Sequence, residues 1–548
     1  METQRALAAI VISLIILVGY QYFFMPAAPV SEKAAISEEQ LQSEVKPQAI
    51  ASAVPAEAAS PSQSQAQPLQ RLTGRDITVQ TSLYQAVISE NGGTIKSFKL
   101  NKYREALAED SPTKELITSQ SDFDLPLLFN WGVGQPTGLP LFSADKGAIA
   151  TAEGRSQALT MKTTIAGLEI ERELTFIDDQ YLINMDITVR NTGQQPLQGA
   201  PNISLVNRPF SPEESNHFLF TGPAVYLNDE LIEIKLKELK DGPKSMAGQL
   251  SWLAYEDTYF MCSIMGNGGE QQTVNLSLKG EDTVFSTLSG SNDIIPAGGE
   301  HTYTYTIYMG PKEIKTLQES GHNLEKIINF GWFDVIAKPT LHLLNFLNTY
   351  LHNYGLAIIL VTILFKAVLW PISHKGMKSM KTMQKIQPKM VKLREKYKDN
   401  KEKLNQEMIA LYKTYKVNPV GGCLPMILQI PVFFALYKVL LQTIELRHAP
   451  FMLWITDLSA PDRLFIGIDI PYLGGIPVLT LLMGASMFLQ QKMTPTAADP
   501  TQAKMMMFLP VIFTFMFLNF ASGLVLYWFI NNLLSIGQQY FINRSVDA

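Results

Sequence analysis

The sequence is poor in charge and nearly lacks cysteine. Asp, Glu, Lys and Arg make up 17% of its 548 residues, whereas soluble globular chains carry about 25%. The two cysteines, Cys262 and Cys423, lie far apart in a polar region and an apolar run, which excludes a disulfide framework. No CxxC pair, HExxH, GxSxG or P-loop pattern occurs. We therefore expect no metal, no cofactor and no enzymatic activity.

Long apolar runs are present at the N-terminus and after residue 350. A run of about 20 apolar residues can cross a bilayer. Residues 6–24 exceed the usual apolar core of a signal peptide. We therefore interpret residues 1–25 as an uncleaved anchor, with a cleaved signal as the alternative. Five further spans are predicted at residues 354–373, 421–441, 472–491, 504–520 and 523–542. The chain is thus predicted to be a polytopic α-helical membrane protein with six spans.

A large polar region separates the first span from the others. Residues 26–72 are rich in Ala, Pro, Ser, Gln and Glu, a composition typical of a disordered linker. Alternating strands then begin, and Asn91-Gly92-Gly93 marks a hairpin turn. Further short strands are predicted at residues 159–165, 168–176, 181–189, 273–278 and 302–309. We expect one antiparallel β-sandwich over residues 73–320.

Residues 321–353 have the apolar periodicity of an amphipathic helix. The polar residues between the apolar positions favour a helix lying in the membrane interface rather than a span. Because proline lacks the amide hydrogen that a helix interior needs, we expect the helix to be interrupted at Pro339.

The distribution of charge predicts the topology. Residues 374–417 hold 13 Lys or Arg against 4 Asp or Glu, whereas the loop at residues 442–471 is richer in acids. Basic loops remain in the cytoplasm, so the segment 374–420 and the short loop 492–503 are predicted to be cytoplasmic. Six spans then place both termini in the cytoplasm and the β domain outside it.

Lys366 is the one charge well inside a predicted span, and it can be explained in two ways. Its stem could simply extend to the interface. Alternatively it could line a wet cavity, because polar side chains follow helical spacing in four spans. These candidate groove residues are Thr362, Gln429, Ser486, Gln490, Asn531, Asn532 and Ser535. The other halves of the spans are apolar, so the cavity is predicted to open to the cytoplasm and to be sealed on the outer side.

The last five spans contain no Asp or Glu. Ion-coupled transporters commonly use intramembrane carboxylates. A solute carrier is therefore disfavoured.

The basic cytoplasmic segment predicts a helical hairpin. A methionine stripe of Met377, Met380 and Met383 is flanked by Lys378, Lys381 and Lys385, Pro388 breaks or starts a helix, and Asp399-Asn400 forms the turn. The stripe could pack against the hairpin's own second helix or bind varied apolar partners. The lysines could bind anionic lipid or ribosomal RNA.

Three segments resemble the YidC/Oxa/Alb family of membrane protein insertases. They are Asn418-Pro419-Val420-Gly421-Gly422-Cys423-Leu424-Pro425, Ala449-Pro450-Phe451 with Trp454 and Asp457-Leu458-Ser459, and Ser522-Gly523-Leu524-Val525-Leu526-Tyr527-Trp528. The resemblance implies a periplasmic β-supersandwich, a cytoplasmic hairpin and a hydrophilic groove with one positive charge. It also implies substrate contacts at Thr362, Tyr527 and Trp528. Lys366 stands where better-known members have arginine, and the short tail lacks the basic extension of some members.

The resemblance implies an insertase and chaperone of the Gram-negative inner membrane. Its expected partners are nascent membrane proteins, lipid, the Sec translocon, and the ribosome or signal recognition pathway through the cytoplasmic loops. Two alternatives remain. One is a Sec-dependent folding chaperone without independent insertion. The other is a periplasmic carbohydrate-binding or enzymatic domain on a membrane anchor.

Overall fold

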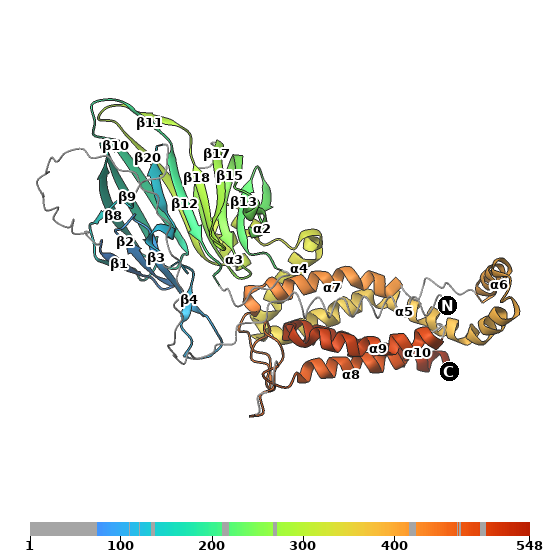
Figure 1. The fold of residues 1–548 in the computed structure, drawn as a ribbon. Helices are drawn as coiled ribbons and strands as arrows, with labels where there is room; N and C mark the ends of the chain where they lie inside the picture. Colours follow the sequence, from blue (N-terminus) through green and yellow to red (C-terminus); the bar gives the residue numbers. More distant parts are fainter. Residues whose placement is uncertain are drawn as a thin grey trace, which may run out of the picture. The chain divides into compact units, whose positions relative to one another are not determined.

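The structure is a computed structural model. It describes residues 74–547 except 109, 120, 133–137, 211–218, 267–270, 416–423, 468–469, 471–472 and 494–499. The predicted anchor, the linker up to residue 72 and the Pro419-Val420-Gly421-Gly422 motif lie outside the described residues. The described chain forms a β domain followed by a group of helices (Figure 1).

The described residues of the β domain form three sheets, where the alternating segments predicted one antiparallel sandwich. A five-stranded sheet has the order β4-β3-β2-β1-β7, and the largest sheet runs β5-β12-β18-β17-β15-β16-β20-β10-β9-β8-β6, with β13 and β14 branching from β15. The third sheet is the pair β11-β19. The strands are β1 (Asp76–Gln80), β2 (Tyr84–Ser89), β3 (Ile95–Arg104), β4 (Thr113–Glu115), β5 (Leu128–Trp131), β6 (Ser143–Ala144), β7 (Ala148–Ala150), β8 (Ser156–Ile165), β9 (Leu168–Ile177), β10 (Leu182–Asn191), β11 (Leu197–Gly199), β12 (Pro201–Asn207), β13 (Gly222–Leu227), β14 (Glu230–Glu233), β15 (Lys244–Glu256), β16 (Phe260–Gly266), β17 (Gln271–Lys279), β18 (Thr283–Ser289), β19 (Asp293–Ile295) and β20 (Glu300–Pro311).

The predicted hairpin after β2 is confirmed. Strands β2 and β3 pair antiparallel, with Ile88 opposite Ile95. Gly92 and Gly93 have φ angles of 75° and 62°, a left-handed conformation that glycine adopts without steric penalty. The strands predicted over residues 159–189, 273–278 and 302–309 are also confirmed as β8, β9, β10, β17 and β20. Pairing is antiparallel except between β1 and β7.

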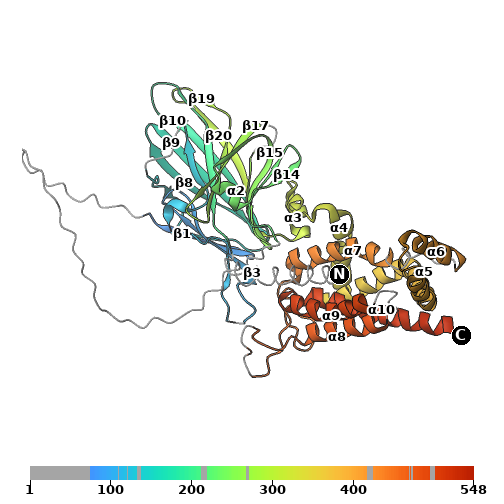
Figure 2. The same ribbon diagram turned by 45° about the vertical axis from the view of Figure 1, so that its right-hand side comes forward.

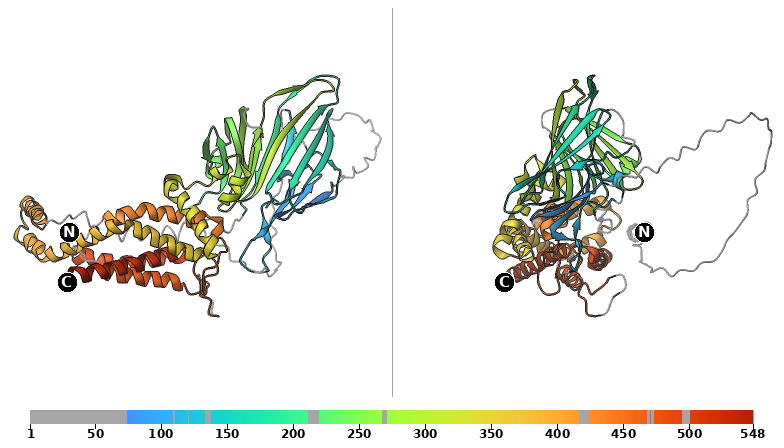
Figure 3. Two further views of the ribbon diagram at one scale, coloured as in Figure 1. Left: turned by 180° about the vertical axis from the view of Figure 1, so that it is seen from behind. Right: turned by 90° about the vertical axis from the view of Figure 1, so that its left-hand side faces the viewer.

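Arg172 on β9 ties the five-stranded sheet to the largest one. Its side chain is fully buried, and its guanidinium donates hydrogen bonds to the carbonyl oxygens of Gly93 and Leu127. Burial lowers the pKa of Arg172 to about 10. Figure 3 shows the blue strands of the smaller sheet lying against the larger sheet. A buried cation that satisfies two backbone acceptors therefore fixes this packing.

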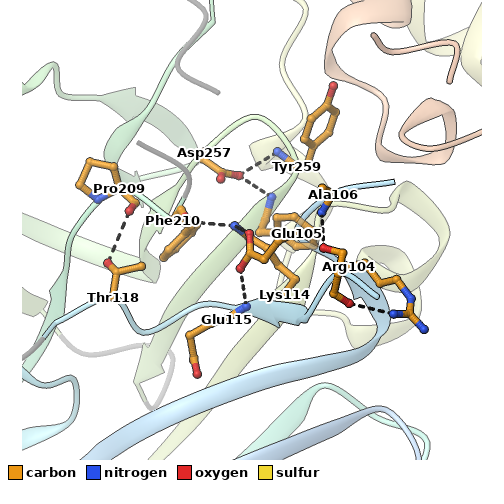
Figure 4. A network of polar contacts seen from close by, with 12 residues as sticks. Arg104, Glu105, Ala106, Lys114, Glu115, Thr118, Pro209, Phe210, Asp257 and Tyr259 are labelled. Carbon is orange, nitrogen blue, oxygen red and sulfur yellow. Dashed lines mark hydrogen bonds and ion pairs between the residues drawn. The ribbon is translucent and has the colours of Figure 1, made fainter. Parts of the chain in front are cut away.

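Lys114 fixes the end of the β3–β4 hairpin. Its side chain is fully buried, and its ammonium lies 2.8 Å from Glu105 Oε2 and 2.8 Å from the carbonyl oxygen of Phe210 (Figure 4). The backbone N–H of Glu115 donates to the other oxygen of the same glutamate at 3.0 Å. Glu105 thus holds both its buried partner and the neighbouring strand.

Several short helices precede the long helix α4 (Asp334–Leu351), and one of them lies within the β domain. They are α2 (Leu236–Lys240), within the β domain, then α3 (Ile314–Ser320), η3 (Leu324–Ile327) and η4 (Gly331–Phe333). Contrary to expectation, α4 runs through Pro339, and the interruption lies before it at residues 328–333. Proline removes a hydrogen bond to Val335, whose side chain is 85% exposed. Since that carbonyl lies on the exposed face, the loss is tolerated.

Helix α5 (Tyr354–Lys396) continues beyond the predicted span without a break. It contains Pro371 and Pro388, so the expected break at Pro388 is wrong. The packing of Met383, Ile386 and Met390 against α6 (Lys401–Thr414) continues across this proline and compensates for the missing hydrogen bond. Asn400 caps α6 by accepting a hydrogen bond from the N–H of Lys403 at 3.0 Å. The two helices form the predicted hairpin.

Four more helices lie alongside α5 (Figure 2). They are α7 (Leu424–Gln442), α8 (Val478–Met493), α9 (Pro500–Met516) and α10 (Ser522–Asp547), with η6 (Ile444–Leu446) and η7 (Phe517–Asn519) at their ends. Among the described residues, α5 alone is long and apolar enough to cross a bilayer, and Leu428–Gln442 and Met506–Asn519 are shorter apolar helices. Helix α8 starts six residues later than the predicted span, because Pro477 precedes it.

The loop between α7 and α8 contacts the β domain. The Arg447 guanidinium donates to the carbonyl oxygens of Arg104 and Glu105 at 2.8 and 3.0 Å, and it lies 5.7 Å from the ring centre of Phe260. The same Glu105 holds Lys114. Arg447 therefore binds the backbone of the segment that this buried pair stabilises.

Candidate substrate groove

A cavity of about 430 Å³ lies among helices α7, α8, α9 and α10. Three glutamines, two asparagines and two aromatic residues with polar edges line it together with apolar side chains. The lining residues are Gln429, Ile430, Phe433, Met487, Gln490, Gln491, Leu509, Pro510, Phe513, Tyr527, Trp528, Asn531 and Asn532. Six of the predicted groove residues are among them. An apolar cavity with a few polar groups is typical of a binding site.

Helical spacing on α10 explains why its polar residues share this cavity. Tyr527 and Asn531 are four residues apart, as are Trp528 and Asn532. Side chains four residues apart lie one above the other on a helix face. Consequently, one face of α10 changes from aromatic to amide along the cavity wall.

Aromatic packing closes one end of the cavity. The ring centre of Trp528 lies 4.7 Å from that of Phe433 and 5.2 Å from that of Phe517. Beyond these rings, Leu524 and Val525 are fully buried. The apolar half predicted from the sequence is therefore tightly packed.

Lys366 on α5 contacts polar side chains of α10 next to the cavity. Its half-buried ammonium donates to Ser535 Oγ at 2.6 Å and to Asn531 Oδ1 at 3.4 Å. No carboxylate lies within 4.0 Å of it among the described residues. Since Asn531 also lines the cavity, the positive charge adjoins the cavity wall without an anionic partner.

Thr362 does not line the cavity. Its side chain is only 2% exposed, and its hydroxyl donates to the carbonyl oxygen of Ile358 at 2.6 Å. The threonine is therefore bonded within its own helix. Spacing had placed it on the Lys366 face, but a helix face includes both open and packed positions.

Ser486 and Asn532 join α8 to α10. The amide of Asn532 donates to Ser486 Oγ at 3.0 Å, and that hydroxyl donates to the carbonyl oxygen of Met483 at 2.6 Å. Both residues are nearly fully buried. Gln538, further along α10, is 1% exposed and finds no hydrogen-bond partner among the described residues. Only part of the predicted polar set therefore remains open to the cavity.

The methionine stripe of the hairpin is divided between two environments. Met383 is buried in the seam with α6, whereas Met377 and Met380 are half-buried. Lys378 and Lys385 are exposed, but Lys381 is buried at 7% exposure. Self-packing thus accounts for the end of the stripe nearest the turn.

Two aspartates hold the loop between α7 and α8, the buried Asp462 and the half-buried Asp457, and sequence analysis assigned them no role. Asp462 is 2% exposed and accepts hydrogen bonds from Trp454 Nε1 at 2.5 Å and from the backbone N–H of Thr480 at 3.1 Å. Asp457 accepts from the N–H of Ser459 at 2.8 Å. The sequence feature that could have identified them is a tryptophan close to two aspartates in one loop, because a buried carboxylate must accept hydrogen bonds from nearby donors.

Comparison with known proteins covers nearly the whole described chain. Residues 346–548 match the family described as 60Kd inner membrane protein, and residues 76–343 match the YidC periplasmic domain. Membrane protein insertase YidC of Syntrophus aciditrophicus is 43% identical over 568 residues, covering 99% of each chain. The Pelobacter propionicus protein of the same name is 41% identical over 559 residues, again covering 99% of each.

A crystal structure of an active YidC insertase with its first transmembrane domain resolved is also similar. It has a TM-score of 0.36 and 19% identity, and the match covers 86% of this chain and 95% of that one. The two matched family regions and the full-length relatives agree. The chain therefore belongs to the YidC family, whose curated members are named membrane protein insertases.

Proposed function

We propose that this chain inserts integral membrane proteins into the inner membrane and helps them fold, and that the cavity beside Lys366 receives the polar segment of the substrate. One observation carries the proposal. An ammonium group without a carboxylate partner among the described residues adjoins a cavity lined by amides, and aromatic packing closes the cavity at one end.

Lys366 attracts acidic residues of the incoming segment. A pair at about 4 Å gains about 4 kcal/mol at an effective dielectric constant near 20. Placing a carboxylate at the bilayer centre costs about 2.5–3.5 kcal/mol on insertion scales. Because the two free energies are similar, the groove draws an acidic segment inward without trapping it.

The neutral partners of Lys366 leave it able to bind substrate. A lysine ammonium has three N–H donors, and Ser535 and Asn531 accept two of them. One donor remains for a substrate carboxylate. Lysine also lacks the planar fork with which arginine binds both carboxylate oxygens, so recognition relies on attraction rather than on a fixed geometry.

Release of the substrate follows from the apolar exterior of the helices. Phe508 and Phe515 on α9 are 68% and 70% exposed, as expected for side chains that face lipid. An apolar substrate helix leaves the groove sideways because lipid is its more favourable environment. The aromatic packing around Trp528 keeps the polar segment from crossing as through an open pore.

The proposed topology has six spans, counting residues 6–24, with both termini in the cytoplasm and the β domain in the periplasm. The basic hairpin, with exposed Lys378 and Lys385, then faces the cytoplasm. Helix α4 lies in the interface, because Trp332 in the preceding η4 and Val335 in its first turn are 100% and 85% exposed while Leu341 and Leu344 are buried.

The hairpin is the proposed contact for the ribosome or the signal recognition pathway, and the Sec translocon is the proposed partner for multi-span substrates. Exposed lysines favour anionic surfaces such as RNA and lipid headgroups. Half-buried Met377 and Met380 remain available for apolar substrate segments.

The test replaces Lys366 in protein reconstituted alone into liposomes. For a single-span substrate with an acidic translocated tail, Lys366→Ala is expected to lower insertion about tenfold, and Lys366→Arg to retain most of it. A matched substrate with a neutral tail should insert equally well with all variants. Protease protection of the tail measures insertion.

Lys438→Ala is the matched control, since Lys438 also lies in an apolar helix but outside the cavity lining. Unchanged insertion of the acidic substrate by Lys366→Ala would refute the electrostatic attraction. If the parent protein inserts nothing without Sec, the chain is a Sec-dependent chaperone instead.

A further inference from the structure

A polar cavity of about 410 Å³ lies in the β domain, outside the helices that form the groove. Strands β15, β16 and β20 form its floor, and the β13–β14 turn and the link from α3 to η3 form its rim. Its lining residues are Asn228, Asp229, Gln249, Leu250, Ser251, Met265, Gly266, Thr304, Thr306, His322 and Asn323. Cavities of about 300–1,000 Å³ accommodate small ligands.

Short neutral hydrogen-bonding groups dominate this lining. Amides and hydroxyls come from six residues, and Asp229 and His322 are the two titratable groups. The lining contains no lysine or arginine, the side chains that most strongly bind phosphate and carboxylate groups, and its two larger apolar residues, Leu250 and Met265, are only 5% and 1% exposed. The chemistry therefore disfavours an anion and a lipid.

Hydrogen bonds hold the walls in place. Asn228 Oδ1 accepts from the backbone N–H of Gln249 at 2.9 Å, and Trp252 Nε1 donates to the carbonyl oxygen of Asn323 at 3.2 Å. On the floor, the Thr304 hydroxyl donates to Asp186 Oδ1 at 2.6 Å, so its oxygen can still accept. The cavity is thus preformed rather than a space between mobile side chains.

Unusual backbone conformations gather at the rim. Eleven non-glycine residues of the described chain have a positive φ angle, and four of them line this cavity: Asn228, Asp229, His322 and Asn323. Such conformations persist where the surroundings fix them, and they are enriched at ligand sites. They aim four polar residues at one small volume.

Gln272 on β17 packs against Gly266, which lines the cavity, but Gln272 itself is not a lining residue. It is 8% exposed, and its Oε1 has no hydrogen-bond partner among the described residues. Its amide packs against Gly266, where a Cβ atom would come within 2.4 Å of Gln272 Nε2. Glycine at position 266 thus leaves room for the Gln272 amide behind the cavity floor.

We propose that this cavity binds an uncharged sugar or short oligosaccharide. Hydroxyl groups on adjacent carbons both donate and accept, and so can pair with the mixed amides and hydroxyls of the lining. This site is separate from the proposed groove, and binding does not require insertion.

Binding is tested with the full chain in lipid nanodiscs free of sugar-based detergent. The probes are maltotriose and chitotriose, with glucose 6-phosphate as the charged comparison, and saturation-transfer NMR and calorimetry measure binding. We expect at least one trisaccharide to bind and glucose 6-phosphate not to bind. Trp252 fluorescence should change on binding, because its indole is bonded to the rim at Asn323.

Thr306→Val and Thr302→Val form a matched pair on the same face of β20, since only Thr306 lines the cavity. Loss of the hydroxyl at 306 should weaken sugar binding about tenfold, equivalent to about 1.4 kcal/mol. Thr302→Val should not alter the affinity, and both variants should retain parent insertion activity. Absence of binding by both trisaccharides, equal binding of the phosphate sugar, or equal weakening by both variants would overturn the proposal.

Discussion

Lys366 and Glu445 are two ionisable side chains whose hydrogen-bond partners are neutral. Lys366 keeps two neutral hydrogen-bond acceptors and no carboxylate among the described residues. Glu445 lies in the loop after α7, where Asn345 Nδ2 donates to its Oε1 at 3.1 Å. Burial, aided to a smaller extent by the neighbouring Glu313, raises the pKa of Glu445 to about 7 against the hydrogen bond from Asn345. Its proton is therefore exchanged near neutral pH.

This pKa predicts a loss of stability as pH rises. The unfolded carboxyl has a pKa near 4.5, so between pH 4.5 and 7 the folded chain holds a proton that the unfolded chain has lost. The Glu445 contribution is fully present below pH 4.5 and is lost as pH rises through 7, by on the order of 3 kcal/mol. Thermal unfolding from pH 4.5 to 8 should show it.

Glu445→Gln keeps an acceptor for Asn345 but cannot ionise. Its unfolding midpoint should fall less than that of the parent over the same pH range. Equal slopes for the two proteins would contradict the assignment to Glu445. Glu402→Gln, on the exposed face of α6, is the control and should match the parent.

The buried pair Asn532 and Ser486 is a polar contact that joins helices α8 and α10. Ser486→Ala leaves the buried Asn532 amide without this acceptor, which costs about 1–3 kcal/mol. Asn532→Ala removes the same hydrogen bond and leaves a cavity at a buried position, although Ser486 stays bonded to the carbonyl oxygen of Met483. Ser486→Ala and Asn532→Ala should therefore each lower the unfolding midpoint. The double variant should be less destabilised than the sum of the two.

A double-mutant cycle by thermal unfolding in nanodiscs measures this coupling. Strict additivity would mean that the 3.0 Å contact contributes nothing. The insertion of an acidic substrate offers a second measurement, because Asn532 also lines the cavity.

At the level of elements, sequence patterns predicted strands well and helix ends less well. Alternation sets the buried face of a strand, so β8, β9 and β10 could be located from local residues alone. Pro339 and Pro388 were expected to interrupt helices but do not. Local rules count the hydrogen bond that proline loses, whereas packing against other helices, as at Met383, compensates for it.

For the groove, the residue types were predictable but their exposure was not. Spacing placed Thr362 and Lys366 on one face of α5, yet Thr362 is bonded within its helix and Lys366 reaches Ser535. Spacing defines a face, but the rotation of each helix against its neighbours decides which positions stay open. Asp462 was missed for the same reason, because its donors Trp454 and Thr480 meet only in the folded loop.

For the whole molecule, the location of the groove in the helices alone predicts that the β domain is dispensable for insertion. All residues of the proposed groove belong to α5, α7, α8, α9 and α10. Replacing residues 76–311 with a short linker should therefore retain at least half of the insertion of a single-span substrate. Protease protection in liposomes measures this, and loss of insertion would locate an essential function in the β domain.

The length of α5 has a mechanical consequence. At about 1.5 Å per residue, its 43 residues span roughly 65 Å, and one rod carries both the ammonium at Lys366 and the seam at Met383. Pro371 lies between them and is the compliant point, because it lacks one backbone hydrogen bond. We therefore expect a force on the hairpin to bend helix α5 at Pro371, while the hydrogen bonds to α10 hold Lys366 in place. The hairpin could then change its direction without displacing Lys366.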